Sequence, residues 1–254
     1  MIDFVVKGAI FDVDDTLLDN KPGVPGFGLH ERSRLAAVHE VGKRRGIKEL
    51  EDVSVDENWS AFRDAPVHTI EAAVWGIFLK KGLADSDVIN LEHPLLKEIV
   101  VLKDELHKDV LLNEANEVPG ATDFVFRLST SGLKDKMAIA SSAIRRDVDL
   151  FLDKTGMDAI FTKEKITTIE NITHPKPHPE AFNIAFDSLN LPETDRFAVC
   201  AFEDDPRGIV SARAAGLYVC AITTRYKKEE LLALEFPPHL VADSYTEFCE
   251  LFQV

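Results

Sequence analysis

Two aspartates at the end of an apolar segment are the first residues of this chain whose types and spacing could do chemistry. Asp12 and Asp14 follow the run VVKGAIF at 5–11 and are separated by one residue. Side chains two positions apart in an extended chain project from the same face, so these carboxylates begin as near neighbours. Carboxylates that close repel each other unless a cation lies between them or one of them is protonated. The pair therefore indicates a cation site or an acid–base pair.

A lysine and a group of acids later in the chain could complete such a site. Lys176 stands between two prolines in HPKPHPEAF, which makes it a fixed positive charge ahead of a helix. Glu203, Asp204 and Asp205 follow the apolar run RFAVCAF at 196–202. Mg²⁺ prefers oxygen ligands and keeps several waters, so one or two carboxylates can hold it. These acids are therefore candidates for a cation site.

The apolar runs that precede these groups predict buried strands, because parallel strands covered on both faces are apolar at successive positions. Helical patterns of 10 to 15 residues lie between most of the runs. This alternation predicts an α/β fold with a doubly wound parallel sheet. After the first run, the predicted strands are KMAIASS (136–142), AIFT (159–162), RFAVCAF (196–202), LYVCAITT (217–224) and LVADS (240–244).

The segment at 19–115 has a different character, because helical patterns dominate it and β-type runs are almost absent. The Pro- and Gly-rich stretch at 21–28 and a second stretch at 113–120 predict linkers or hinges at its two ends. We therefore predict an α/β core at 1–18 and 116–254, with an inserted all-helical domain at 19–115. Open α/β sheets bind ligands beyond the carboxyl ends of their strands, so the insertion would lie over the site.

Composition narrows the class of protein. The 254 residues carry a formal net charge of −15, which argues against nucleic acid as a partner. Three cysteines without C-x-x-C spacing are typical of a reducing compartment. The N-terminus lacks the basic start of a signal peptide, and no stretch approaches 18 apolar residues. These features predict a cytoplasmic location and no membrane partner.

Four short motifs together resemble those of the haloacid dehalogenase-like (HAD) superfamily. FDVDDTLLD resembles the first motif, D-x-D-x-T, and Ile139-Ala140-Ser141-Ser142 resembles the second. The pattern K-P-x-P at Lys176 resembles the third motif, and FEDDPRG at 202–208 resembles the fourth. The long helical interval after the first motif resembles the subgroup that includes phosphoglycolate phosphatase and β-phosphoglucomutase relatives. The resemblance implies a Rossmann-like core with a helical cap domain.

The resemblance also implies roles for the motif residues in a phosphatase. Asp12 matches the nucleophile that forms an aspartyl-phosphate, and Asp14 matches the general acid that protonates the leaving group and later activates water. Thr16 matches the threonine that phosphatases keep after these acids. Ser141 matches the hydroxyl that binds the transferring phosphoryl group, and Lys176 would offset the charge that develops there.

The resemblance also implies a site for Mg²⁺, and Asp204 is the first candidate ligand. Asp12 and the backbone carbonyl of Asp14 would share the ion with it. Glu203 would bind directly or through water. Asp205, which stands where the family more often has serine, would orient a metal-bound water.

The expected function is a Mg²⁺-dependent phosphatase acting on a small phosphorylated metabolite, and relatives imply a monomer or a weak dimer. Ser142, His30 and His68 are further candidates for substrate binding. One alternative is a β-phosphoglucomutase-like sugar-phosphate mutase. Two others are a phosphonatase, for which Lys97 and Lys103 are available, and a non-catalytic binding protein on the same fold.

Overall fold

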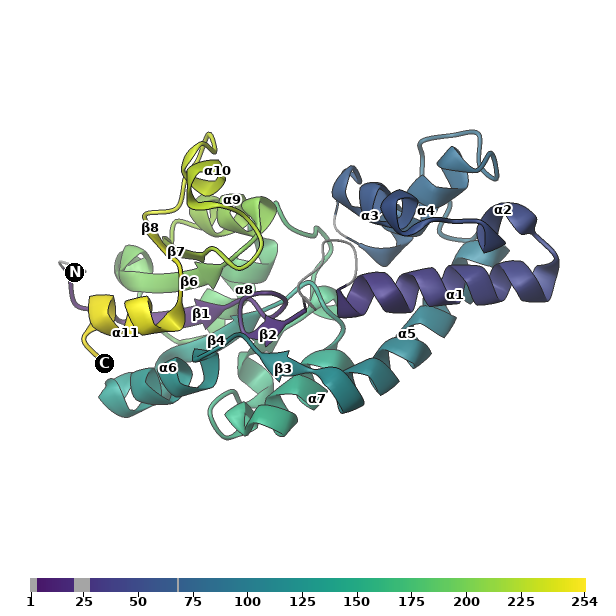
Figure 1. The fold of residues 1–254 in the computed structure, drawn as a ribbon. Coiled ribbons are helices and arrows are strands. Elements are labelled where there is room, and N and C mark those ends of the chain that lie inside the picture. The colour runs from purple at the N-terminus through teal and green to yellow at the C-terminus, as the bar shows by residue number, and fades with distance from the viewer. Residues whose placement is uncertain (1–3, 21–27, 68) are drawn as a thin grey trace. The chain divides into compact units, whose positions relative to one another are not determined.

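The computed structural model describes residues 4–20, 28–67 and 69–254. It divides into two compact units, Met1–Asp19 with Asn116–Val254 and Asn20–Ala115 (Figure 1). We call the first the core unit and the second the helical unit. His68 and most of the linker predicted at 21–28 lie outside the described residues.

Within the described residues, the core unit contains a six-stranded sheet in the order β5-β4-β1-β6-β7-β8, and every neighbouring pair is parallel. The chain starts in the middle, adds strands on one side and then adds strands on the other, so the sheet is doubly wound as predicted. Ligand sites of such sheets lie where the winding reverses, here beyond the carboxyl ends of the strands next to β1. The strands are β1 (Gly8–Phe11), β4 (Met137–Ala140), β5 (Ile166–Thr167), β6 (Val199–Glu203), β7 (Tyr218–Ile222) and β8 (Leu240–Ala242).

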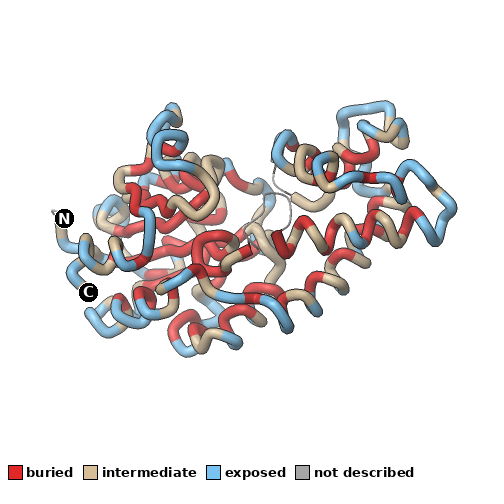
Figure 2. Tube along the Cα trace, in the orientation of Figure 1, coloured by how far each residue is buried: buried red, intermediate tan, exposed pale blue. Residues whose placement is uncertain are grey.

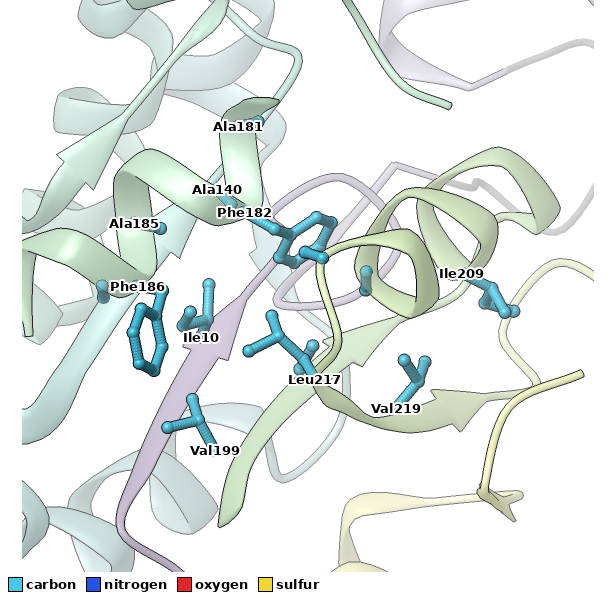
Figure 3. Packing of buried hydrophobic residues seen from close by; sticks show 14 of the residues in the cluster. Ile10, Ala140, Ala181, Phe182, Ala185, Phe186, Val199, Ile209, Leu217 and Val219 are labelled. Atoms are coloured by element: carbon cyan, nitrogen blue, oxygen red, sulfur yellow. The ribbon is translucent and has the colours of Figure 1, made fainter. Parts of the chain in front are cut away.

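One face of the sheet is covered by α8 (Glu180–Ser188) and α9 (Pro206–Ala214), as Figure 3 shows. Phe182 and Phe186 of α8 belong to the same buried cluster as Ile10 of β1 and Val219 of β7. Each side chain of this size stabilises the fold by about 1.5–3 kcal/mol when it is fully buried. The strands that will carry the site are therefore held by a substantial apolar layer.

The opposite face is built from aromatic rings. Phe11 of β1 and Phe202 of β6 are register partners and stack with centroids 4.6 Å apart. Phe124 of α6 (Ala121–Leu128) packs edge-on against both rings, and Phe248 of α11 (Tyr245–Phe252) contacts Phe124 and Phe202. Successive strand residues face opposite sides, which is why Ile10 and Phe11 enter different layers. The strands accordingly appear buried along their length in Figure 2.

Four of the predicted later runs contain a strand, but the run at 159–162 does not, and that prediction was wrong. Ala159 ends a short 3-10 helix, and a turn and a bend follow at Ile160 and Phe161, whose side chains are buried, with the Phe161 ring 5.9 Å from that of Phe11. Apolar character here reflects burial beneath the sheet rather than extended backbone. The strand at this edge is the two-residue β5. The remaining α-helices among the described residues of the core unit are α7 (Arg145–Thr155) and α10 (Lys228–Leu232).

The helical unit packs around its own apolar core. Val38 and Val41 of α1, Phe78 of α4 and Ile99 of α5 are fully buried in one cluster. Local signals fix the helix starts: Ser54 and Glu57 form a capping box on α3. None of the described helices is long and apolar enough to cross a membrane. The helices are α1 (Leu29–Arg45), α2 (Lys48–Glu51), α3 (Val55–Arg63), α4 (Ile70–Lys80) and α5 (Pro94–Glu114).

A short antiparallel pair of strands lies where the chain leaves the core unit and where it returns. β2 (Leu18–Asp19) pairs with β3 (Asn116–Glu117), both in the core unit. The N–H of Val118 also donates to the carbonyl of Leu17 at 2.8 Å. The segment that forms the helical unit therefore leaves and re-enters the core unit at residues that are paired with each other.

Candidate active site

Asp12 lies at the carboxyl end of the central strand. Its N–H donates to the carbonyl of Phe202 at 3.0 Å, and it comes one residue after Phe11, which pairs with Ile139 on one side and Phe202 on the other. The side chain is therefore flanked by the ends of β4 and β6. Beyond it the chain turns sharply at Asp15, whose φ of 57° lies in the left-handed region.

Lys176 faces Asp12 directly. Its Nζ donates to Asp12 Oδ1 at 2.6 Å and to Glu203 Oε1 at 2.6 Å, and only 8% of its side chain is exposed. It also lies over the Phe182 ring, 4.9 Å from the centroid. Burial alone would lower the pKa of Lys176, but the charges of Asp12 and Glu203 and the two hydrogen bonds outweigh it and raise the pKa. The lysine is a permanent cation beside the predicted nucleophile.

Glu203 is engaged through both of its oxygens. Oε1 accepts from Lys176, and Oε2 accepts from the backbone N–H groups of Asp204 at 3.1 Å and Asp205 at 3.2 Å. Gly208 of α9 lies directly against this carboxylate, because a Cβ built there would be 1.8 Å from Oε1. The sequence suggested Glu203 as a metal ligand. Its contacts favour a second role, in which it fixes the position of Lys176.

Asp204 carries a buried oxygen that is not used by the protein. Oδ1 accepts from the Thr16 hydroxyl at 3.3 Å, whereas Oδ2 has no hydrogen-bond partner among the described residues. Burial raises the pKa of Asp204 well above its ordinary value, and the charges of Asp15 and Glu203 raise it further. Burial also raises the pKa of Asp12, although Lys176 opposes the shift. These carboxylates therefore need a proton or a cation.

A divalent cation fits this need. Asp12, Glu203 and Asp204 each offer a carboxylate oxygen, and the three oxygens lie within 4.8 Å of one another. With Lys176 as their counter-ion, the three carboxylates retain two negative charges in a buried place. Oxygen donors and a charge of two suit Mg²⁺, and the unpartnered Oδ2 of Asp204 is the natural ligand.

The side chains of the two other predicted metal residues, Asp14 and Asp205, are not part of this group of three. Asp14 is half-buried and is not among the three clustered carboxylates. Asp205 begins α9 as its N-cap, since its Oδ1 accepts from the N–H of Arg207 at 2.8 Å. Their roles toward a metal stay predictions.

Ser141 and Ser142 follow β4 at the same end of the sheet as Asp12. Ser141 is fully buried. Its N–H donates to the backbone carbonyl of Thr167 at 2.9 Å, and its Oγ accepts from the N–H of Ala143 at 3.0 Å. The hydroxyl proton is still available to an oxygen of a substrate. Ser142 is half-buried. The placement agrees with a phosphoryl-binding role for Ser141, which stays a prediction.

The loop after β7 contacts residues 13–17, which follow Asp12 and which we call the nucleophile loop. The sequence did not indicate this contact. The Thr224 hydroxyl donates to the carbonyl of Asp15 at 2.5 Å, and Arg225 Nη1 lies 3.3 Å from Asp15 Oδ2. Asp15 is buried, so Arg225 compensates a charge that would otherwise add to the carboxylate cluster. The available signal was positional: these polar residues follow an apolar run that ends at the same edge of the sheet.

Tyr245 also contacts this loop, and the sequence did not indicate it. It begins α11, is fully buried, and its hydroxyl donates to the carbonyl of Thr16 at 2.9 Å. The Thr16 hydroxyl in turn donates a hydrogen bond to Asp204 Oδ1. Nothing in the sequence around Tyr245 distinguishes it from an ordinary core aromatic residue.

Of the two histidines predicted to bind substrate, only His30 lies within the described residues. His30 lies near the start of α1 in the helical unit, where its ring stacks on that of His107 with centroids 3.8 Å apart. His68 lies outside the described residues. Both remain predictions as substrate contacts.

Comparison with known proteins decides the family. The model of the haloacid dehalogenase-like hydrolase family matches residues 6–216, which include all four motifs. The chain belongs to this family. The HAD-like assignment made from the motifs is thereby confirmed, and the protein is a hydrolase of that family.

Relatives of this HAD-like hydrolase include named phosphatases. It is 26% identical over 226 residues to glycerol-1-phosphate phosphohydrolase 2 of Saccharomyces cerevisiae, covering 87% of this chain and 76% of the relative. It is 34% identical over 112 residues to protein CbbY of Rhodobacter capsulatus, covering 44% of this chain and about half (47%) of the relative.

Solved structures share the fold of this HAD-like hydrolase. A family IA, variant 3 HAD hydrolase from Entamoeba histolytica matches with a TM-score of 0.69 and 23% identity, covering 95% of this chain and 94% of that one. CbbY from Rhodobacter sphaeroides in complex with phosphate matches with a TM-score of 0.69 and 20% identity, covering 96% of each chain. At these identities the likeness establishes the fold.

Proposed function

We propose that this protein is a Mg²⁺-dependent phosphatase that hydrolyses a small phosphate monoester through an aspartyl-phosphate on Asp12. The observation that carries the proposal is the pairing of Lys176 with Asp12 at 2.6 Å, next to a cluster of three buried carboxylates. Asp12 is held at a strand end by its backbone, and its counter-ion is held by Glu203. The arrangement presents one carboxylate oxygen in a fixed position, which is what an attacking group needs.

In the first step a carboxylate oxygen of Asp12 attacks phosphorus and the bond from phosphorus to the ester oxygen breaks. Asp14 donates a proton to the departing oxygen, so that an alcohol leaves. In the second step Asp14 removes a proton from water, which attacks the same phosphorus and releases phosphate and Asp12. One acid thus serves both half-reactions in opposite directions.

The remaining residues stabilise charge and position the phosphoryl group. Lys176 keeps its positive charge at neutral pH and partly neutralises the attacking carboxylate and the phosphoryl oxygens. The Ser141 hydroxyl donates to a phosphoryl oxygen. Bound Mg²⁺, held by Asp204 and Asp12, would neutralise further charge on the phosphoryl group. Thr16 holds Asp204 in place through its hydroxyl.

Small polyol and sugar phosphates are the proposed substrate class. A glycerol-1-phosphate phosphohydrolase is among the relatives that match most of this chain, and a CbbY structure of the same fold was solved with phosphate. We propose that the helical unit acts as the cap that selects the leaving group, with His30, His68 and Ser142 as candidate contacts. The predicted cytoplasmic location and monomeric or weakly dimeric state stay predictions.

The test is phosphate release from a panel of monoesters, including glycerol phosphates, sugar phosphates, phosphoglycolate and nucleoside monophosphates, with Mg²⁺ and with EDTA. Asp12→Asn is nearly isosteric and should lower turnover by about 10⁴-fold or more while the protein stays folded. Asp187→Asn changes an exposed aspartate of α8 and serves as the matched control, with wild-type turnover expected.

The outcomes separate the candidate functions. Release that requires Mg²⁺ and is absent in Asp12→Asn supports a phosphatase. Turnover of Asp12→Asn at the wild-type rate would refute the mechanism. No release from any ester would direct the next assay to isomerisation of sugar phosphates.

A further inference from the structure

Two histidines and a glutamate meet on the loop that carries Lys176. His174 Nδ1 lies 2.9 Å from Glu180 Oε2, and His178 Nδ1 lies 3.9 Å from the same oxygen. One ligand atom from each residue lies within 4.8 Å of the other two. The histidine side chains are 63% and 51% exposed, so solvent and ions can reach them. The proposed phosphatase reaction uses none of the three.

The spacing of these atoms suits a tetrahedral metal ion. Zn²⁺ binds imidazole nitrogen and carboxylate oxygen at about 2.0–2.2 Å, which places two ligands of one ion about 3.4 Å apart. The two distances to Glu180 Oε2, 2.9 and 3.9 Å, lie on either side of this value. The Nδ1 of His178 accepts from the N–H of Glu180 at 3.3 Å, and a rotation that releases this bond would bring the three groups to a common centre.

The carboxylate of this group is already oriented. Glu180 is the first residue of α8, and its oxygens accept from the backbone N–H groups of Thr173 at 3.0 Å and His174 at 2.9 Å. A carboxylate oxygen has lone pairs for both an N–H and a metal ion. The bonds therefore hold the ligand in place without using it up, as outer partners do in metal sites.

We propose that His174, His178 and Glu180 form a second metal site that takes a borderline divalent ion such as Zn²⁺. The donor types separate it from the cluster around Asp12, because imidazole suits Zn²⁺, Cu²⁺ and Ni²⁺ whereas an all-oxygen cluster suits Mg²⁺. Three protein ligands leave the fourth position to water. The net charge of −15 favours any cation near the surface.

Occupation of this site would restrain the loop that carries Lys176. The two histidines lie two residues before and two residues after Lys176, and Glu180 belongs to a helix packed on the sheet. An ion bound to all three ties both ends of the loop to α8. Zn²⁺ should therefore slow hydrogen exchange of the backbone N–H groups of Thr173, His174, Lys176 and His178.

The experiment is calorimetric titration of the full chain with Zn²⁺ in the presence of saturating Mg²⁺. We expect one Zn²⁺ per chain, with affinity lowered about 10–100-fold in His174→Gln and in His178→Gln, since even outer-shell changes at metal sites have effects of this size. Asp204→Asn removes an oxygen from the other cluster and should leave Zn²⁺ binding unchanged. His39→Gln, a histidine of the helical unit, is the control for non-specific loss.

Absence of Zn²⁺ binding would overturn the proposal. So would unchanged binding in both His174→Gln and His178→Gln, or binding lost in Asp204→Asn, which would assign the ion to the carboxylate cluster. Both histidines are exposed, so the glutamine variants should keep the wild-type melting temperature, and their titrations can be compared directly. None of these outcomes depends on phosphatase activity.

Discussion

Adding a single methyl group at Gly208 should disable the site through Glu203. The Cβ of Gly208→Ala would lie 1.8 Å from Glu203 Oε1 and 2.0 Å from its Cδ, where real Cβ contacts are not shorter than about 3.0 Å. The carboxylate must therefore retreat by about 1.2 Å or more. It then leaves the position from which it holds Lys176 at 2.6 Å.

The cost follows from what the displaced carboxylate contacts. Overpacking of a buried site costs about 1–3 kcal/mol, and breaking a buried ion pair costs about 3–5 kcal/mol. We expect Gly208→Ala to lower the free energy of unfolding of the core unit by about 3–5 kcal/mol, because part of the ion pair survives between Lys176 and Asp12. A misplacement of about 1 Å beside the nucleophile should lower kcat/KM by about 10²-fold.

Urea unfolding and steady-state phosphate release measure the two effects. Gly76→Ala is the matched control: its Cβ would lie 3.4 Å from Ala61, an ordinary contact, and alanine is favoured over glycine within α4 by about 1 kcal/mol. Glu203→Asp shortens the side chain and moves the carboxylate away from the new methyl group. In a double-mutant cycle it should therefore reduce the loss of stability and of kcat/KM caused by Gly208→Ala. Wild-type stability and activity of Gly208→Ala, or strict additivity with Glu203→Asp, would refute the reasoning.

Three further changes test the contacts around the site. Tyr245→Phe removes the hydroxyl that donates to Thr16, and urea unfolding should show a loss of about 1–3 kcal/mol; an unchanged midpoint would mean that the bond contributes nothing. Arg225→Gln removes the guanidinium that lies 3.3 Å from the buried Asp15 carboxylate, so urea unfolding should show lower stability, and adding Asp15→Asn should restore stability in part. His239 has its pKa lowered by burial, and by a neighbouring guanidinium, to about 4 from 6.5. The folded state therefore binds fewer protons than the unfolded state between these values, and this contribution to stability is lost as pH falls from about 6.5 to about 4. His239→Asn should lose that component, which melting temperatures at pH 7.5 and 4.5 of variant and wild type would detect.

Much of the sheet could be predicted because parallel strands buried on both faces are apolar throughout. The runs around Ile139, Cys200 and Cys220 are such strands, and each ends at the edge where polar groups gather. The short strand at 166–167 left no comparable pattern, and the apolar run at 159–162 is buried without being extended. Burial and backbone conformation are separate properties, and hydrophobicity reports only the first.

The site was predictable where chemistry is local in sequence. Asp12, Lys176 and Asp204 stand in short motifs, and the structure brings them together with Glu203. The contact of Tyr245 with the nucleophile loop joins residues 229 positions apart, and no local pattern encodes it. The close approach of Gly208 to Glu203 is local in sequence, but nothing in the sequence shows which side chain fills the space beside the glycine.

The pairing of Leu18–Asp19 with Asn116–Glu117 makes the helical unit a replaceable module. The core residues that flank it are neighbours in a hydrogen-bonded ladder, so a hairpin turn of a few residues could join Asp19 to Asn116 without changing the register of the six-stranded sheet. Insertions at such points are tolerated because few contacts of the host fold cross them. Evolution can therefore exchange this segment for another of different length and keep the fold of the core, and a protein engineer can graft a different domain at the same two residues.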